Sequence, residues 1–171
     1  GAGIAEMLLQ SHEEFIHLLP AIPDEWKAEG AVTGMKARGN ITVDFAWKNG
    51  RVTNYTLSSP ERQLVKLKLN GEIKEVYTRA TQLQVAGIFG DSMVLQRHTP
   101  IKIWAWAPAG KTITARFHKQ QKQTRADAGG RWEIVLQPEA AGGPYDLQLN
   151  EKSLKGILMG DIWVCSGQSN M

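Results

Sequence analysis

Ser169 is the residue of this sequence whose type and surroundings best suit nucleophilic chemistry. It stands in the pentapeptide Ser166–Asn170, directly after the apolar run Ile162–Cys165, and Gly167 permits a tight turn between the two. A nucleophilic serine requires such a turn after a strand, because the turn exposes Oγ and presents backbone N–H groups to an oxyanion. The same pentapeptide is also typical of an ordinary loop serine, so the pattern alone leaves both interpretations open.

A second serine, Ser92, stands in the tripeptide Gly90-Asp91-Ser92 after the apolar run 85–89. Gly-Asp-Ser is a common nucleophile sequence in lipase-like SGNH hydrolases. Here, however, the apolar segment 93–96 and then Pro100 follow directly. This leaves no helix whose N-terminus would seat the serine. We therefore interpret Ser92 as a turn residue.

The four histidines are the candidate bases, since a serine nucleophile needs a base within hydrogen-bond reach that a carboxylate orients. His17 lies in an apolar strand and is interpreted as structural, His118 lies on a basic hairpin and should be solvated, and His98 precedes a Thr-Pro turn. None of them, His12 included, follows an aspartate by three residues, so the sequence contains no Asp-x-x-His pair. No spacing matches a zinc motif, and we expect no metal or cofactor.

A basic stretch could bind a ligand rather than catalyse. It consists of Arg116, Lys119, Lys122 and Arg125. We interpret it as the solvated edge of a hairpin, where Lys and Arg block the addition of another strand. A patch that faces an anion or a polysaccharide is the alternative interpretation, and the sequence does not exclude it.

Two tryptophans also have two interpretations. Trp104 and Trp106 alternate with Ile103 and Ala105, so both indoles lie on one face of a strand. Such a pair is more often sandwich core than a platform on which a sugar stacks, and we favour the core. Cys165 lies inside the last apolar run and is interpreted as a buried thiol.

Composition excludes several classes of protein. The chain has 171 residues, of which 22% are charged and 42% hydrophobic; this excludes wholesale disorder and a coiled coil. The net charge of +3 is too weak to argue for nucleic acid. No apolar run approaches the ~18 residues of a membrane-spanning helix, so we expect no membrane span. The first residues lack an initiator Met, a basic region and a cleavage site, and we expect the chain to be part of a longer protein.

The first half of the chain predicts a short helix and then hairpins. Residues 4–9 have near-helical apolar spacing, and Pro20 and Pro23 prevent a long helix further on. Two pairs of alternating runs follow, each joined by Asn-Gly: 41–47 with 51–57, and 63–69 with 72–78. Asn-Gly between two such runs is a strong hairpin signal, because a type I′ turn needs two residues at positive φ.

The second half predicts another β unit. Residues 78–84 carry no periodic apolar face and predict a junction. Beyond it, alternating runs separated by turn signals cover 101–107, 112–118, 122–128, 131–136, 145–149 and 153–159. Strands at this spacing predict a small antiparallel sandwich. The run Ile162–Cys165 is typical of a strand that is buried on both faces. The predicted fold class is therefore mainly β.

Residues 83–171 resemble the sialate O-acetylesterase family of SGNH-type carbohydrate esterases. The matching stretches are Phe89–Arg97, Ile101–Gly110, Ala126–Leu136, Ala141–Leu149 and Gly160–Met171, the last being highly specific. In that family the serine of Gly-Gln-Ser-Asn-Met is the nucleophile, a role that the resemblance gives to Ser169. The family's β-domain precedes a three-layer α/β hydrolase domain that begins near this motif, which implies that the run Ile162–Cys165 is its first strand. The family stretch that matches Phe89–Arg97 also supports dismissing Ser92.

Residues 1 to about 80 resemble the C-terminal end of α-L-fucosidases of glycoside hydrolase family 95. The matching stretches are 2–12, 16–26 and 32–52. The resemblance implies that the first stretch is the last helix of an (α/α)₆ barrel and that a C-terminal β-sandwich follows. The family's catalytic acids belong upstream, so no residue of this chain is assigned to them.

The two resemblances together imply five segments. They are 1–13, the barrel helix; 14–77, the fucosidase β-sandwich; 78–84, the junction; 85–160, the esterase β-domain; and 161–171, the start of the hydrolase domain.

We expect a fragment of a periplasmic or secreted hydrolase that acts on O-acetylated and fucosylated glycans. The family's oxyanion glycine, asparagine and Asp-x-x-His pair are all missing from this stretch. We therefore expect the 171 residues alone to be inactive. The alternative is a pair of non-catalytic β-sandwich modules that pack against catalytic domains or bind carbohydrate.

Overall fold

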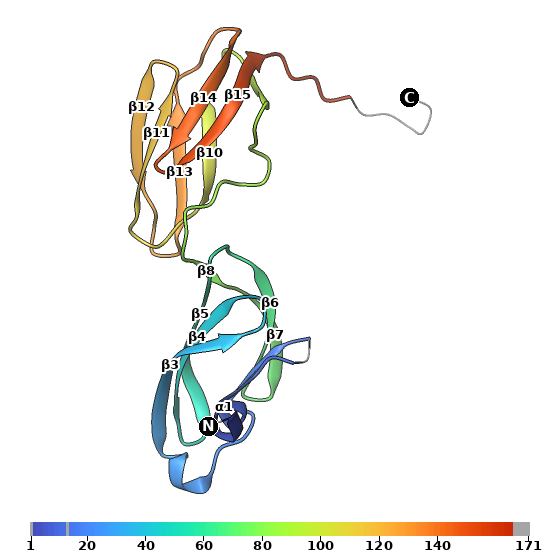
Figure 1. The fold of residues 1–171 in the computed structure, drawn as a ribbon, viewed down its shortest axis with the longest axis vertical. Helices are drawn as coiled ribbons and strands as arrows, with labels where there is room; N and C mark the ends of the chain where they lie inside the picture. The colour runs from blue at the N-terminus through green and yellow to red at the C-terminus, as the bar shows by residue number, and fades with distance from the viewer. Residues whose placement is uncertain (1, 13, 166–171) are drawn as a thin grey trace. The chain divides into compact units, whose positions relative to one another are not determined.

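The computed structural model of the chain describes residues 2–12 and 14–165. The chain divides into two units, unit 1 (Gly1–Leu83) and unit 2 (Gln84–Met171), and each has its own sheets (Figure 1). The mainly β fold class predicted from the sequence is confirmed. In the described ranges, regular helix is confined to α1 (Ala2–Leu8) and a 3₁₀ turn, η1 (Asp24–Trp26).

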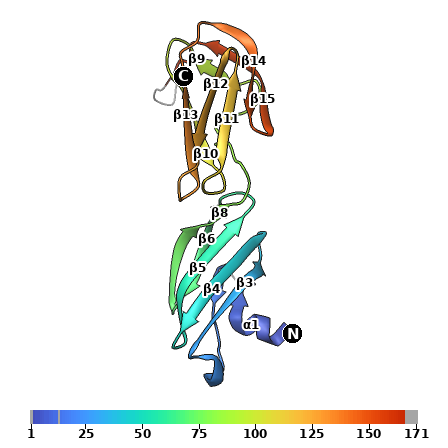
Figure 2. The same ribbon diagram turned by 90° about the vertical axis from the view of Figure 1, so that its left-hand side faces the viewer.

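Unit 1 consists of two four-stranded sheets. Their strand orders are β1-β2-β6-β7 and β3-β4-β5-β8, and β3, β4 and β5 lie side by side in Figure 2. The strands are β1 (Leu9–Gln10), β2 (Ile16–Leu18), β3 (Glu29–Ala37), β4 (Ile41–Lys48), β5 (Arg51–Ser59), β6 (Leu64–Leu69), β7 (Glu72–Tyr77) and β8 (Arg79–Ala80). Neighbours are antiparallel except for the parallel pairs β2–β6 and β5–β8.

Both predicted Asn-Gly hairpins are confirmed. Asn49 and Gly50 have φ values of 51° and 68°, and Asn70 and Gly71 have values of 52° and 94°. These positive angles are those that a two-residue type I′ turn requires. The turns set the antiparallel registers of β4 with β5 and of β6 with β7.

The core of unit 1 lies between its two sheets. Along β4 the apolar residues at alternate positions are buried and the residues between them are half-buried, as the alternation predicts. The buried residues that fill this core are Leu8, Leu9, Ile16, Leu18, Ala37, Ile41, Val43, Phe45, Trp47, Val52, Leu57 and Leu67.

The N-terminal helix differs from the sequence prediction. It ends at Leu8, and the chain passes directly into β1. Leu8 and Leu9 are each only 8% exposed and belong to the core of unit 1, whereas Ile4 and Met7 are exposed. The N–H of Leu19 also donates to the carbonyl of Leu8 at 2.8 Å. The end of the helix is therefore anchored within the chain, on the core of unit 1.

Unit 2 consists of a two-stranded and a five-stranded sheet. The strand orders are β10-β13 and β12-β11-β14-β15-β9, antiparallel except for the parallel pair β15–β9. The strands are β9 (Val94–Gln96), β10 (Ile101–Trp106), β11 (Thr112–Phe117), β12 (Gln120–Arg125), β13 (Arg131–Leu136), β14 (Gly142–Leu149) and β15 (Lys152–Gly160).

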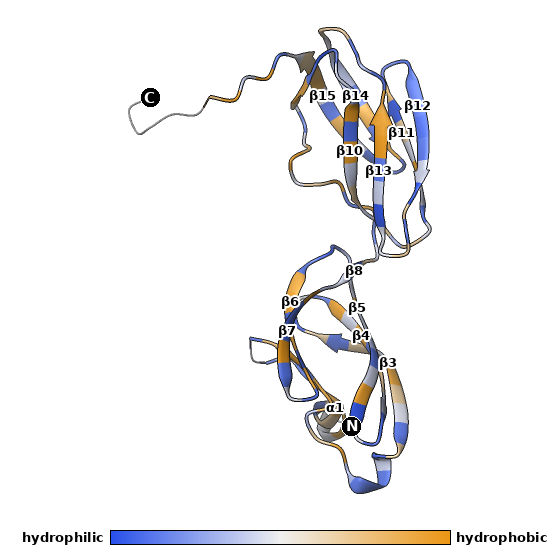
Figure 3. Ribbon diagram, turned by 180° about the vertical axis from the view of Figure 1, so that it is seen from behind, coloured by the Kyte–Doolittle hydropathy of each residue, from blue (hydrophilic) through white to orange (hydrophobic). Residues whose placement is uncertain are grey.

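The core of unit 2 corrects the prediction for the two tryptophans. Hydrophobic and more hydrophilic positions alternate along β10 (Figure 3), and Ile103 and Ala105 are fully buried. Trp104 and Trp106 lie on the opposite face and are only half-buried. The smaller side chains of Ile103 and Ala105 fill the space between the sheets. The segment before β9 lies along β10, where the backbone N–H groups of Gln84 and Ala86 donate to the carbonyls of Trp106 and Trp104. The pair is therefore not sandwich core.

Lys122 and Arg125 of the basic stretch lie on a sheet edge, as predicted, whereas Arg116 lies on the inner strand β11. β12 is the outermost strand of the five-stranded sheet, and Lys119, Lys122 and Arg125 are exposed. The connection to β11 is the two-residue turn 118–119, slightly earlier than the sequence suggests. Lys122 Nζ donates to the carbonyl of Val135 at 2.7 Å, which ties the edge to the neighbouring sheet.

Candidate functional site

The described chain leads up to the candidate nucleophile but does not include it. Ser169 lies outside the described residues, which end at Cys165. The last strand before it, β15, pairs in parallel with β9. The approach to Ser169 is therefore defined by the end of β15 and by its contacts with β9.

Three hydrogen bonds hold the exit from β15. The backbone N–H of Arg97 donates to the carbonyl of Gly160 at 2.8 Å, and Arg97 Nε donates to Asp161 Oδ1 at 2.8 Å. The N–H of Ile162 donates to Gln96 Oε1 at 2.8 Å. Residues 96–97 thus bind the chain at three successive positions, and they set the direction in which it leaves the sheet.

Arg97 and Asp161 form an ion pair in which each side chain stabilises the charged form of the other. The hydrogen bond and charge of Arg97 lower the pKa of Asp161, and Asp161 raises the pKa of Arg97 in return. Gln96 Nε2 lies 3.4 Å from the same Asp161 oxygen and supports the lowered pKa. Both side chains are 40% exposed, so the pair orients the chain more than it stabilises the fold. The partners are 64 residues apart, and no local sequence signal could have joined them.

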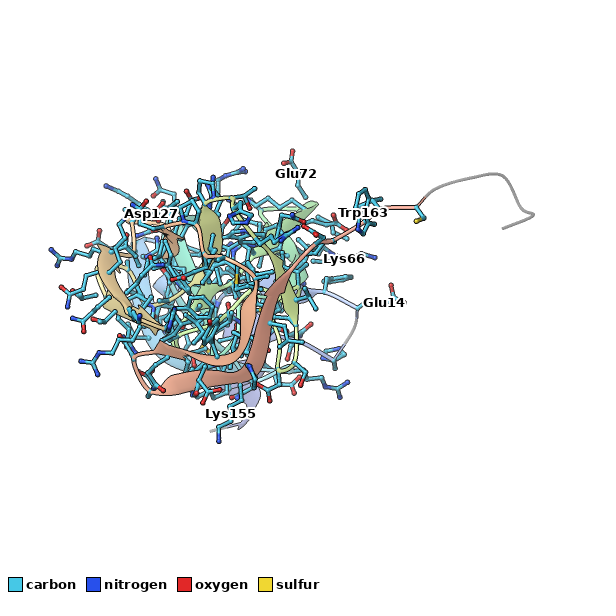
Figure 4. The ribbon with its side chains drawn as sticks, turned by 90° about the horizontal axis from the view of Figure 1, so that it is seen from above. Glu14, Lys66, Glu72, Asp127, Lys155 and Trp163 are labelled. Atoms are coloured by element: carbon cyan, nitrogen blue, oxygen red, sulfur yellow. The ribbon has the colours of Figure 1, made fainter. Side chains whose placement is uncertain are left out.

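The segment after Asp161 contradicts the predicted buried strand. Residues 161–165 form no strand, and Trp163 lies on the segment that leaves unit 2 (Figure 4). The exposed fractions are 50% for Ile162, 84% for Trp163 and 92% for Val164. Cys165 is exposed too, so the prediction of a buried thiol is wrong. Burial on both faces needs a strand on each side, and within the described ranges no strand pairs with these residues.

Ser92 occupies a turn that is bonded to β15. Its φ is 60°, and its N–H donates to the carbonyl of Lys155 at 2.7 Å. Asp91 Oδ1 accepts the N–H of Lys155, a residue labelled in Figure 4, at 2.7 Å. Gly156 packs directly against Ser92. The Gly-Asp-Ser tripeptide therefore fastens this loop to the bulged strand β15, and the sequence interpretation of Ser92 as a turn residue agrees with this geometry.

His118 is not the freely solvated side chain that the sequence predicts. Its ring stacks on Tyr145 with centroids 4.4 Å apart and planes at 19°. Its Nδ1 lies 3.3 Å from Glu139 Oε2. A hydrogen bond from Gln120, followed by that from His118, lowers the pKa of Glu139. This is a histidine oriented by a carboxylate, but the partners are 21 residues apart, so a search for Asp-x-x-His could not find them.

The other candidates remain separate. His98 lies in the turn after β9 with a φ of 57°, His17 is half-buried in β2, and His12 is exposed. In residues 2–12 and 14–165, no group of three or more His, Cys, Asp or Glu side chains is arranged to hold a metal ion. None of the helices in this part of the chain has the length and apolar character needed to span a membrane.

Comparison with known families finds a match that covers more than half of the chain. The family described as glycoside hydrolase family 95, C-terminal domain, matches residues 10–100, which is more than half of the chain. The chain belongs to the family of glycoside hydrolase family 95 C-terminal domains. The family 95 match begins at the end of β1 in unit 1 and extends past β9 in unit 2.

Individual relatives support both halves of the sequence resemblance. The chain is similar to a sialate O-acetylesterase of Homo sapiens, with 33% identity over 101 residues, 50% of this chain and 19% of that protein. It is also similar to alpha-L-fucosidase 2 of Arabidopsis thaliana, with 43% identity over 61 residues, 35% of this chain and 7% of that protein. The chain thus joins regions related to two kinds of enzyme, as the sequence predicts.

A solved structure adds a further likeness. A carbohydrate acetylesterase from Xanthomonas citri has 33% identity, covers 47% of this chain and 19% of its own, and superposes with a TM-score of 0.45. The chain spans about a fifth or less of the length of each of these relatives.

Proposed function

We propose that the chain is part of a longer hydrolase that removes O-acetyl groups from sugars, with Ser169 as the nucleophile. The similarity to sialate O-acetylesterases carries this proposal, together with the Gly-Gln-Ser-Asn-Met ending. The family 95 region adds an α-L-fucosidase part to the same protein. The substrates are then O-acetylated and fucosylated glycans, and the location is periplasmic or extracellular.

The proposed reaction is acyl transfer through the serine. Ser169 Oγ attacks the acetyl carbonyl carbon, and a base takes the hydroxyl proton as the new C–O bond forms. Backbone N–H groups of the turn hold the negative charge of the tetrahedral intermediate. The sugar oxygen leaves with the proton, and water then hydrolyses the acetyl-enzyme. The resemblance to the esterase family places the base in an Asp-x-x-His sequence, which this chain does not contain, so in this proposal the base comes from another segment of the longer protein.

Residues 96, 97 and 161 have a positioning role in this proposal. The bonds of Gln96 and Arg97 to Asp161 and Ile162 fix the chain at its exit from β15. The nucleophile follows eight residues after Asp161. A fixed exit reduces the conformational freedom of the segment that carries Ser169, which favours a productive position of its hydroxyl.

Covalent labelling tests the assignment of the nucleophile. The test uses a longer protein that contains this chain. A serine-directed fluorophosphonate should attach one label to each molecule of this protein, and mass spectrometry of its peptides should locate the label on Ser169. An Asp161→Asn variant should be labelled more slowly but at the same residue. A label on Ser92, or none on the peptide with Ser169, would reject the proposed nucleophile.

A further inference from the structure

A polar hollow lies on the outer face of the five-stranded sheet of unit 2. Its volume is about 290 Å³. Each lining residue is polar, and the set comes from β11, β12, β14 and the turn after β14: Thr114, Arg116, Gln121, Gln123, Gln148 and Asn150. A surface built from amides, a hydroxyl and a guanidinium favours a hydrophilic ligand that remains partly hydrated.

The strand registers arrange these side chains in two parallel rows. Arg116 lies opposite Gln121 on one side and opposite Gln148 on the other. Thr114 lies opposite Gln123, two residues along β11 and therefore on the same face. The guanidinium thus stands at the centre of an amide-lined surface that rigid strands position.

Hydrogen bonds within the hollow fix several of these groups. Arg116 Nε donates to Gln121 Oε1 at 2.9 Å, and Gln123 Nε2 donates to Thr114 Oγ1 at 3.0 Å. Gln148 Nε2 donates to the carbonyl of Asn150 at 2.5 Å. These contacts leave the amide oxygens of Gln123 and Gln148 as acceptors and the amide nitrogen of Gln121 as a donor. Sugar hydroxyls both donate and accept, so they match this mixture.

The charge of Arg116 selects among hydrophilic ligands. In the described part of the chain, no carboxylate lies within 4.0 Å of Arg116, and its terminal nitrogens keep their donors for a ligand. Two parallel N–H groups match a carboxylate. A phosphate would satisfy the guanidinium but offers at most one or two hydrogens to the amide oxygens near pH 7, and a neutral sugar would not use the charge.

We propose that this face binds an acidic sugar, with Arg116 holding the carboxylate and the amides holding ring hydroxyls. The site lies on unit 2 alone and does not depend on the acetylesterase proposal. It adds a glycan-binding role to the outer face of the five-stranded sheet and predicts that this unit favours acidic over neutral glycans.

Galacturonate and galactose are matched probes, because they differ only in whether C6 is a carboxylate or a hydroxymethyl group. We expect galacturonate to shift the NMR signals of Thr114, Gln121, Gln123 and Gln148 in the 171-residue chain saturably, with millimolar affinity. Galactose should bind about tenfold more weakly, which corresponds to the loss of one bidentate charged contact. Acetate, which has the charge without the hydroxyls, should cause no saturable shift.

Two arginine variants distinguish binding at this site from a general effect of the protein's positive charge. Arg116→Gln should lower the affinity for galacturonate to that for galactose, whereas Arg131→Gln, an equal charge change on β13 of the other sheet, should leave it unchanged. Equal effects of the two variants, binding of acetate or an acidic peptide as tight as that of galacturonate, or no saturable shift with galacturonate would each overturn the proposal.

Discussion

Two buried hydroxyl groups in unit 1 are held by hydrogen bonds to each other and to the backbone. Ser59 and Thr78 are buried, and their oxygens lie 2.6 Å apart. Thr78 Oγ1 also accepts the N–H of Gln63 at 2.9 Å, while Ser59 Oγ donates to the carbonyl of Glu61 at 2.5 Å. The four groups close the connection between β5, β6 and β8. Sequence alone gives no sign of this network, because its members are ordinary polar residues in a stretch without periodicity.

Replacing Thr78 with valine should destabilise unit 1. The shape is retained, but the N–H of Gln63 loses its acceptor inside the fold, and the hydroxyl of Ser59 keeps only its bond to the carbonyl of Glu61. We expect a loss of about 1–3 kcal/mol in the free energy of unfolding, measured by urea denaturation followed through NMR signals of unit 1. Thr53→Val, at an exposed position of β5, should change it by less than about 0.5 kcal/mol. Equal losses in both variants would contradict the network.

Gly30 should not tolerate a side chain. A Cβ at this position would lie 2.3 Å from a ring carbon of Trp47, whose Nε1 donates to the carbonyl of Trp26 at 2.8 Å. Gly30→Ala should therefore displace the indole and cost about 1–3 kcal/mol, with a red shift of tryptophan fluorescence. Gly3→Ala on α1, where an added Cβ would have open space, is the control and should not destabilise the fold. Unchanged fluorescence in Gly30→Ala would rule out this clash.

At the scale of elements, the sequence predicts the turns and strands that depend on interactions between neighbouring residues. The Asn-Gly turns and the alternation along β4 follow from neighbouring residues, and both are confirmed. The parallel pairings β2–β6, β5–β8 and β15–β9 join distant segments and leave no local signal. The alternation in β10 correctly places both tryptophans on one face. It cannot say that the smaller side chains fill the core.

The contacts at the exit from β15 also join distant segments and leave no local signal in the sequence. Arg97 belongs to a stretch that the sequence connects with the esterase family, yet its partner Asp161 becomes visible only in the folded chain. Ser169 lies outside the described residues, so its role stays a prediction from the sequence resemblance. The run Ile162–Cys165 is misjudged because apolar character alone does not supply neighbouring strands.

Low pH should break the ion pair between Arg97 and Asp161 at the exit from β15. The pKa of Asp161 is lowered by Arg97, so the pair is fully formed above the ordinary aspartate pKa of about 3.9 and is lost as the pH falls through the lower folded value. We expect the NMR signals of Arg97 Nε–H and of the Ile162 amide to shift together in acid, with a midpoint below that of a free aspartate. The Asp161→Asn variant should show no such transition. A midpoint at or above the ordinary value would contradict the pairing.

At the scale of the whole molecule, the chain divides into two units with separate sheets, and the family 95 match covers most of the first. Mutations in one core should then leave the other unit's stability unchanged. Phe45→Ala, in the core of unit 1, should cost about 3–5 kcal/mol in the unfolding transition of unit 1. The transition of unit 2, followed by its own NMR signals, should not move. A single transition that shifts as a whole would contradict this independence.

Limited proteolysis tests the same division. Linkers are cut first because they make few contacts. We expect cleavage first at the exposed residues 163–165, and next within residues 81–84, where the backbone bonds of unit 1 end at Gln82 and those of unit 2 begin at Gln84. Both sites should be cut before β4 or β13. Early cleavage inside either of these strands, with 81–84 intact, would contradict the division into units.

The most direct test of the central claim compares two serine variants in a longer protein that contains this chain and the family's Asp-x-x-His sequence. The measurement is the rate of acetyl-ester hydrolysis, with fucoside hydrolysis as an internal control. Ser169→Ala should reduce the esterase rate by about 10³-fold or more and leave the fucosidase rate intact, whereas Ser92→Ala, in the turn bonded to β15, should leave both rates nearly unchanged. An esterase abolished by Ser92→Ala but indifferent to Ser169→Ala would contradict the account.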